Sequence, residues 1–304
     1  MAKDSIRARE IQTGLWLVLP AVLVLLLVYA YPIGRAFVLS FFTENLSTNL
    51  EAVPTGFNNY VRMFLDSRFW NSIWSTTIFT AVSLALELVL GMSFALVLDQ
   101  SFRGRGPVRT IAILPWALPT ALIALAWRWI FNGEFGVWND MLINWFHIID
   151  EPVNWLGHPV WAMVSAIAAD VWKTTSFVAI LLLAGLQSIP QELYEAHEVD
   201  GATPWQSFTQ ITIPLVMPQI IIAMLFRFAQ AFGIFDLLIV MTGGGPGGAT
   251  EMVSLYIYDT IMRYLDFGYG AALVVVTFLI LISVVAIAGV FLSRARSASG
   301  VEQS

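Results

Sequence analysis

The sequence contains no cysteine among its 304 residues. This absence excludes disulfide bonds and thiolate metal sites, and it leaves no redox chemistry from which a compartment could be inferred. Histidine is nearly as scarce, since the chain has three. His147 and His158 fall in one connecting segment without the spacing of metal ligands. We therefore predict no metal site.

Lysine occurs only at Lys3 and Lys173, and neither residue follows a glycine. A P-loop needs a glycine-rich turn followed by Lys and Ser or Thr to hold nucleotide phosphates. The one glycine run, Gly243-Gly244-Gly245-Pro246, has no basic partner. We predict that the chain does not hydrolyse ATP by this mechanism and carries no cofactor. No combination of nucleophile, base and metal ligands indicates an enzyme.

Charge of either sign is also sparse, because charged residues make up 12% of the chain and apolar residues 58%. Soluble domains average about 25% charged residues. Uncharged runs of about 20 residues, long enough to cross a bilayer, recur along the chain. We predict an all-α membrane protein, one permease domain over residues 1–304, with about six transmembrane helices. The expected spans are Gly14–Gly34, Ser72–Leu98, Thr110–Trp129, Val160–Ala184, Ile213–Met241 and Ala271–Leu292.

Basic residues predict the orientation, because Lys and Arg are enriched on the cytoplasmic side of membrane proteins. Six spans place both termini on one side. That side would carry Lys3, Arg7, Arg9, Arg103, Arg105, Arg109, Arg294 and Arg296. The other side would carry Arg35, Arg62, Arg68 and Arg263. We expect a multi-pass protein of the inner (cytoplasmic) cell membrane, surrounded by lipid, with both termini in the cytoplasm.

A polar segment, residues 187–214, separates the fourth and fifth predicted spans. Pro190 suits the start of a helix over Gln191–Asp200, and Gly201 suits its end. The sequence Thr203-Pro204-Trp205-Gln206 has the form of a capping box at the start of a second helix. We predict two short helices joined by a glycine hinge, with an acidic surface.

This segment resembles the coupling loop of the membrane subunits of ABC importers, which reads Glu-Ala-Ala, three residues, Gly, nine residues, Ile-x-Leu-Pro. The matching residues are Glu195, Ala196, Gly201, Ile211 and Pro214. Two positions depart from the pattern, because His197 replaces an alanine and Ile213 replaces the leucine. The resemblance implies that the loop docks on a separate cytoplasmic ATPase. The residues assigned to this contact are Glu195, Ala196, His197, Asp200 and Gly201.

Further segments are similar to carbohydrate importer permeases, in particular to the sugar-holding half of the maltose-type pair without its large periplasmic insertion. They are Leu114–Pro119, Ile130–Gly133, Phe235–Asp236, Met241–Pro246, Thr250 and Phe267–Ala272. The resemblance implies four kinds of partner: a second homologous permease, two ATP-binding cassette subunits that bind ATP and magnesium, an extracytoplasmic solute-binding protein and a small-molecule sugar. No nucleic acid partner is expected.

By the same resemblance, solute contacts are expected on three segments. The residues are Trp116, Thr120, Asp170, Lys173, Thr174, Phe177, Arg227, Gln230, Ala231 and Ile234. The spacing i, i+3, i+4, i+7 holds for Asp170, Lys173, Thr174 and Phe177, and again for Arg227, Gln230, Ala231 and Ile234. This spacing places the members of each group on one helix face. Packing of these faces against neighbouring helices is the alternative interpretation.

Ionisable residues inside the predicted spans are balanced in sign, with three acids and three bases. They are Glu87, Arg128, Asp170, Lys173, Arg227 and Asp236. Such residues usually face a cavity or a partner. The balance favours a neutral, hydroxyl-rich solute, such as the disaccharides trehalose and maltose or a glucoside like glucosylglycerol. Asp170 and Lys173 lie three apart on a helix, so a local ion pair is an alternative role for them.

Two other functions are open at this point. A glycerol 3-phosphate importer permease would share much of the pattern. An ion-coupled secondary transporter would use Asp170, Lys173 and Arg227 as an ion relay, but it would leave the spacing of residues 195–214 unexplained.

Overall fold

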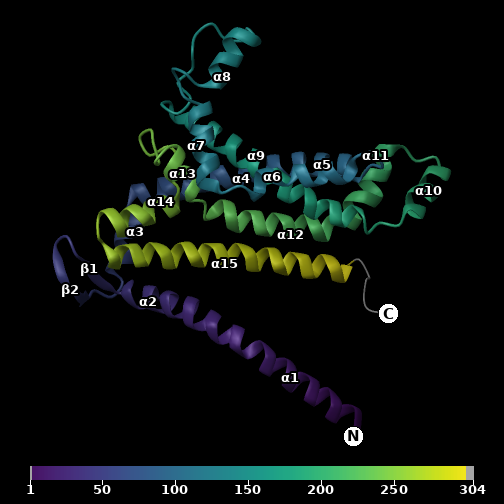
Figure 1. Ribbon diagram of the computed structural model, residues 1–304. Helices are drawn as coiled ribbons and strands as arrows, with labels where there is room; N and C mark the ends of the chain where they lie inside the picture. The colour runs from purple at the N-terminus through teal and green to yellow at the C-terminus, as the bar shows by residue number, and fades with distance from the viewer. Residues whose placement is uncertain (1, 299–304) are drawn as a thin grey trace. The chain divides into compact units, whose positions relative to one another are not determined.

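The computed structural model describes residues 2–298, and it is almost entirely helical (Figure 1). It divides into two compact units. One contains the chain up to Asp66 together with Ile257–Leu279, and the other contains Ser67–Tyr256 and the chain from Ile280. Residues 299–304 of the predicted domain lie outside the described residues, as do the side chains of Lys3, Arg7, Arg9, Arg294 and Arg296. The all-α prediction is confirmed.

The first unit combines the N-terminal helix with a short hairpin and a strip from later in the chain. Its elements are α1 (Ala2–Leu25), the π-helix η1 (Leu26–Ala30), α2 (Tyr31–Leu39), β1 (Phe42–Asn45), β2 (Asn49–Pro54), α3 (Asn58–Leu65), η4 (Asp259–Arg263) and the first part of α15 (Phe267–Ala298). β1 and β2 pair antiparallel. Arg62 forms an ion pair with Asp266 at 2.7 Å, and its guanidinium lies 3.9 Å from the centroid of the Tyr269 ring. These contacts hold the later strip against α3.

The second unit holds most of the membrane helices. Its elements are α4 (Ser67–Asp99), α5 (Arg105–Ala112), α6 (Leu114–Ala117), α7 (Thr120–Ile130), α8 (Val137–Asp140), η2 (Met141–Trp145), α9 (Pro159–Leu186), α10 (Gln191–Val199), α11 (Pro204–Ser207), η3 (Phe208–Thr212), α12 (Ile213–Phe232), α13 (Asp236–Met241) and α14 (Val253–Tyr258), which ends in the first unit. The helix α9 is central in this unit. Of the residues in its most apolar stretch, 72% are buried, compared with 33% in the corresponding stretch of α4.

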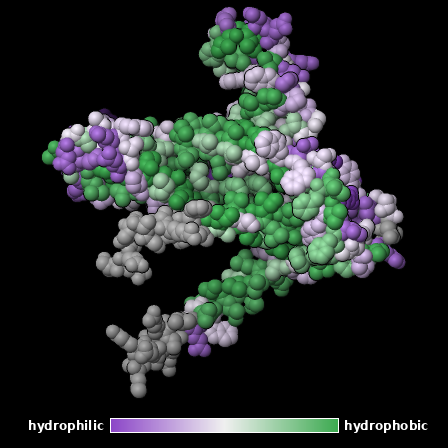
Figure 2. Space-filling model, turned by 180° about the vertical axis from the view of Figure 1, so that it is seen from behind, coloured by the Kyte–Doolittle hydropathy of each residue, from purple (hydrophilic) through white to green (hydrophobic). Residues whose placement is uncertain are grey.

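Small residues let α9 pack closely against its neighbours α4 and α12. A Cβ atom on Gly91 of α4 would lie 2.7 Å from Val178 Cγ1, and one on Gly185 of α9 would lie 3.0 Å from Gln219 Cγ of α12. The apolar core between the three helices consists of Met92, Ala95, Leu98, Val178, Leu182, Leu183, Leu186, Val216 and Ala223. Over this unit, Figure 2 shows hydrophobic residues on the outside of the helical body and hydrophilic residues around α10 and α11. An apolar outer surface of this kind is typical of a protein in lipid.

Within residues 2–298, five helical stretches are long and apolar enough to cross a membrane, and one bent pair makes a sixth if it is counted as one span, which agrees with the prediction of about six. The predicted span Thr110–Trp129 corresponds to this bent pair. The stretches Arg105–Ala117 and Thr120–Ile130 meet at 87°. Leu118 is extended, with φ −75° and ψ 144°, because the ring of Pro119 disfavours helical backbone in the residue before it.

The predicted span Ile213–Met241 is also interrupted. The helix α12 ends at Phe232, Gly233 caps it, and a separate helix α13 begins at Asp236. Glycine is a poor helix former, and the break leaves backbone groups without helical partners. The hydroxyl of Ser254 donates to one of them, the carbonyl of Ile234. Both breaks contain apolar residues, so hydropathy alone does not reveal them.

Candidate functional site

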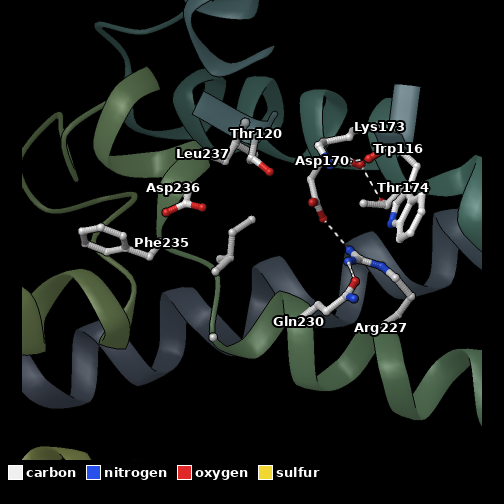
Figure 3. A pocket seen from close by; sticks show the side chains of 12 residues that line it. Trp116, Thr120, Asp170, Lys173, Thr174, Arg227, Gln230, Phe235, Asp236 and Leu237 are labelled. Atoms are coloured by element: carbon white, nitrogen blue, oxygen red, sulfur yellow. Dashed lines mark hydrogen bonds and ion pairs between the residues drawn. The ribbon is translucent and has the colours of Figure 1, made fainter. Parts of the chain in front are cut away.

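The two helix breaks open onto one cavity of about 340 Å³ in the second unit (Figure 3). The residues that line it are Trp116, Thr120, Asp170, Lys173, Thr174, Arg227, Gln230, Gly233, Ile234, Phe235, Asp236 and Leu237. Trp116 and Thr120 flank the bend between α6 and α7, and residues 233–237 span the break between α12 and α13. Discontinuous helices often form solute sites in transporters, and the volume falls within the range of about 300–1,000 Å³ for small-molecule pockets.

Eight of the ten residues predicted to contact the solute line this cavity. The other two do not. Phe177 stacks on the Trp116 ring, with centroids 5.3 Å apart, and thereby supports a wall of the cavity. Ala231 is fully buried in an apolar cluster with Phe79 and Leu238. The structure thus brings the predicted residues together, while contact with a solute stays a prediction.

Arg227 is the centre of a buried ion cluster that joins α4, α9 and α12. Its Nε and Nη2 donate to the two carboxylate oxygens of Glu87 at 2.6 and 2.7 Å. Its Nη2 also donates to Asp170 Oδ2 at 2.8 Å, and its Nη1 donates to Gln230 Oε1 at 3.0 Å. The Thr174 hydroxyl donates to Glu87 Oε1 at 2.6 Å. Charges inside a membrane protein are usually paired in this way or face a cavity.

A local ion pair between Asp170 and Lys173 is not found among the described residues. Asp170 pairs with Arg227 on α12 instead, because a planar guanidinium can bridge two carboxylates. Lys173 Nζ donates to the carbonyl of Trp116 at 3.2 Å. The bend after α6 leaves that carbonyl without a helical partner, which gives the ammonium group an acceptor. That alternative interpretation is therefore wrong.

Two acidic residues of the site were not among the predicted contacts. Glu87 is an intramembrane acid that the sequence reveals only by its place in an apolar span. Asp236 belongs to the Phe235–Asp236 motif, and its carboxylate makes no hydrogen bond or ion pair with any described residue. Figure 3 shows Asp236 and Thr120 on one side of the cavity, with Asp170, Lys173, Arg227 and Gln230 across from them.

These groups offer both hydrogen-bond donors and acceptors to a bound molecule. Lys173 and the amide nitrogen of Gln230 donate, since the Gln230 oxygen already accepts from Arg227. Asp170 and Asp236 accept, and the Thr120 hydroxyl does both. The formal charges of the lining residues cancel, with two acids and two bases. Among the described residues, no three His, Asp or Glu side chains gather to hold a metal ion.

The polar segment forms the short helix α10, a glycine hinge and a second helix, and together these make a hairpin. The second helix is not short as predicted, because α11 continues through η3 into α12 and Pro204–Phe232 is one helical stretch. The helix α10 ends at Val199, and Gly201 has φ +80°, a left-handed conformation that favours glycine. Thr203 and Gln206 form the capping box, in which Thr203 N donates to Gln206 Oε1 at 2.7 Å and Gln206 N donates to Thr203 Oγ1 at 3.3 Å. The first helix, the glycine hinge and the capping box are confirmed, while the second helix is longer than predicted.

The residues assigned to ATPase coupling lie on this hairpin. Glu195, Ala196, Asp200 and Gly201 are exposed. His197 is half-buried, and its Nδ1 is hydrogen-bonded to the Ser207 hydroxyl at 3.0 Å. This bond links α10 to α11 across the hinge. A contact with an ATPase remains a prediction for all five residues.

Known proteins resemble the chain over most of its length. Residues 87–297 match the family of binding-protein-dependent transport system inner membrane components. The chain is 40% identical to the trehalose/maltose transport system permease protein MalF of Thermococcus litoralis, over 92% of this chain and 93% of that protein. It is also 40% identical to the sulfoquinovosyl glycerol transport system permease protein SmoG of Agrobacterium fabrum, over 89% and 87% of the two chains.

A solved structure shares the fold. It is a bacterial ABC transporter involved in the import of the acidic polysaccharide alginate, and one of its chains superposes with a TM-score of 0.79. The match covers 95% of this chain and 99% of that chain, at 24% sequence identity. The match therefore extends beyond residues 87–297, the part that the family match covers.

Proposed function

Because the chain belongs to the family of inner-membrane components of binding-protein-dependent transport systems, we propose that it forms part of the translocation pathway for a neutral disaccharide or glucoside. The cargo would be trehalose, maltose or a molecule like glucosylglycerol. The chain is a permease subunit and not an enzyme, which agrees with the transport names of its relatives.

The pairing of Arg227 carries the choice of a neutral cargo. A guanidinium with free donors is the group best suited to bind a phosphate or another anion in such a cavity. Three of the hydrogen bonds from Arg227 already go to Glu87 and Asp170. The groups left for a solute are an ammonium, an amide, a hydroxyl and two carboxylates, which suit the hydroxyls of a sugar. The trehalose/maltose relative supports the same class.

The remaining parts of the transporter are supplied by other chains in this proposal. A second homologous permease completes the pathway, and an extracytoplasmic solute-binding protein delivers the sugar. Two ATP-binding cassette subunits bind ATP and magnesium in the cytoplasm, on the side of both termini. They contact the exposed face of α10 near Glu195 and Ala196. Closure of the two ATPase subunits moves the hairpin. The membrane spans then move as well, so that the cavity opens to the other side of the membrane.

Substitutions in the cavity test this proposal in proteoliposomes that contain the complete transporter. Lys173→Met and Asp236→Asn each remove a group that faces the cavity but does not belong to the Arg227 cluster. We expect each to raise the half-saturating sugar concentration by roughly tenfold to hundredfold, since a hydrogen bond to a charged group contributes about 1.5–3 kcal/mol. The exposed Glu134 lies outside the cavity, so Glu134→Gln is the control. Unchanged sugar dependence in both cavity variants would contradict the site.

A further inference from the structure

Glu87 is fully buried in α4 and does not line the cavity, yet it contacts two residues that do. We propose that Glu87 sets the charge selectivity of the cavity by neutralising Arg227, so that the permease discriminates against anionic sugars. The inference rests on the proposed function of the cavity as the solute site. Glu87 is a positioning residue in this account, since it acts on the solute through Arg227.

The geometry leaves Glu87 no other role toward a solute. Both of its carboxylate oxygens accept from Arg227, at 2.6 and 2.7 Å. Oε1 also accepts from the Thr174 hydroxyl at 2.6 Å. A two-point pair of this kind fixes the plane of the guanidinium as well as its charge. Arg227 therefore presents a compensated face to the cavity and cannot offer a free fork to a phosphate or sulfonate.

The charge balance around the cavity gives the direction of the effect. The four charged lining residues, Asp170, Lys173, Arg227 and Asp236, cancel one another. Glu87 behind them makes the whole group negative by one charge, which opposes the entry of an anion. Its removal would bring the group to neutrality and release Arg227 Nε from its only described acceptor. Because the site lies among apolar helices, one charge has a larger effect than in water.

The substitution Glu87→Gln distinguishes a role of Glu87 in charge selectivity from a purely structural role. Glutamine keeps the shape and one oxygen that can accept from Arg227 Nη2 and Thr174, while the charge and the acceptor for Arg227 Nε are lost. A purely structural role for Glu87 would weaken the binding of every solute together. A role in selectivity moves the affinities of neutral and anionic sugars apart.

The experiment measures equilibrium binding of labelled trehalose and trehalose 6-phosphate to the purified complex of permeases and ATPases. The solute-binding protein is omitted because it would select among the sugars first. We expect the wild type to bind trehalose more tightly than its phosphate. In Glu87→Gln, the ratio of the two affinities should shift toward the phosphate by about tenfold.

Three further variants complete the design. Arg227→Gln leaves Glu87 unopposed and should shift the ratio toward trehalose, so it tests the inference even if Glu87→Gln does not assemble. The double variant Glu87→Gln/Arg227→Gln restores the wild-type charge and should restore the wild-type preference. The exposed Glu134→Gln loses the same charge elsewhere and should leave the ratio unchanged.

Two results would count against this account in different ways. An equal loss of both affinities in Glu87→Gln, or a ratio that stays at the wild-type value, would overturn the role of Glu87 while leaving the sugar site intact. A wild-type complex that binds none of trehalose, maltose and glucosylglycerol, each measured in the same way, would overturn the proposed function itself, and the inference with it.

Discussion

The substitution Gly91→Ala tests how closely α4 and α9 must pack. The added methyl group would lie 2.7 Å from Val178 Cγ1, 3.0 Å from Val178 Cβ and 3.4 Å from Ala179 N. Valine is stiff in a helix, so its γ carbon cannot turn away, and the helices themselves must separate. Overpacking costs about 1–3 kcal/mol, and the higher helix propensity of alanine returns about 0.8–1.0 kcal/mol. We expect a net loss of about 0–2 kcal/mol, toward the upper end because the valine cannot turn away.

The same substitution should disturb the cavity, because the contact lies one helical turn from the ion cluster. Gly91 follows Glu87 by four residues in α4, and Val178 follows Thr174 by four residues in α9. Separating the helices here would lengthen the bond of 2.6 Å between Thr174 Oγ1 and Glu87 Oε1. Sugar uptake should therefore fall together with thermal stability.

Thermal unfolding of the purified transporter measures the packing effect. Gly91→Ala should lower the unfolding midpoint by a few degrees, at about 2–4 °C per kcal/mol. Gly106→Ala in α5 is the control, since a Cβ there meets no atom within 4 Å, and it should not lower the midpoint. The double variant Gly91→Ala/Val178→Ala should lose less stability than the two single variants lose when their losses are added together. Additive losses, or a midpoint raised by Gly91→Ala, would refute the reasoning.

Three predictions concern the coupling hairpin. Glu195→Arg should abolish solute-stimulated ATP hydrolysis while the chain still inserts, and the matched reversal Glu134→Arg should not; normal hydrolysis in the first variant would rule out a role for that residue. Gly201→Ala places a Cβ at φ +80°, so it should destabilise the hairpin by about 1–2 kcal/mol and lower uptake more than ATP hydrolysis. Thr203→Ala removes the capping box and should cost about 1 kcal/mol, seen as faster proteolysis after α10; equal proteolysis would argue against the cap.

Features that depend on neighbouring residues could be predicted from the sequence. The hairpin is the best case, because Pro190, Gly201 and the capping box of Thr203 and Gln206 act within a few positions of one another. The number of spans followed from the apolar runs. Eight of the residues that line the cavity were predicted from a family resemblance and not from the chemistry of the chain.

Features that depend on distant residues could not be predicted. Glu87 and Arg227 are 140 positions apart. Nothing in the sequence of either helix indicates that these two side chains form an ion pair. The helix breaks at Leu118 and Gly233 escaped hydropathy because apolar residues surround both. Asp170 and Lys173 have the spacing of a helical ion pair. Each instead binds a group on another helix, namely Arg227 on α12 for Asp170 and the Trp116 carbonyl on α6 for Lys173.

Uptake of labelled trehalose is the most direct test of the central claim that this permease imports a neutral sugar. It would be measured in cells with and without the chain, alongside maltose, glucosylglycerol, sulfoquinovosyl glycerol and glycerol 3-phosphate. ATP depletion and a protonophore would be applied separately to identify the energy source. We predict that the chain is required for uptake of a neutral glucoside and that the uptake stops when ATP is depleted. Uptake that follows the proton gradient, or that is restricted to glycerol 3-phosphate, would contradict the account.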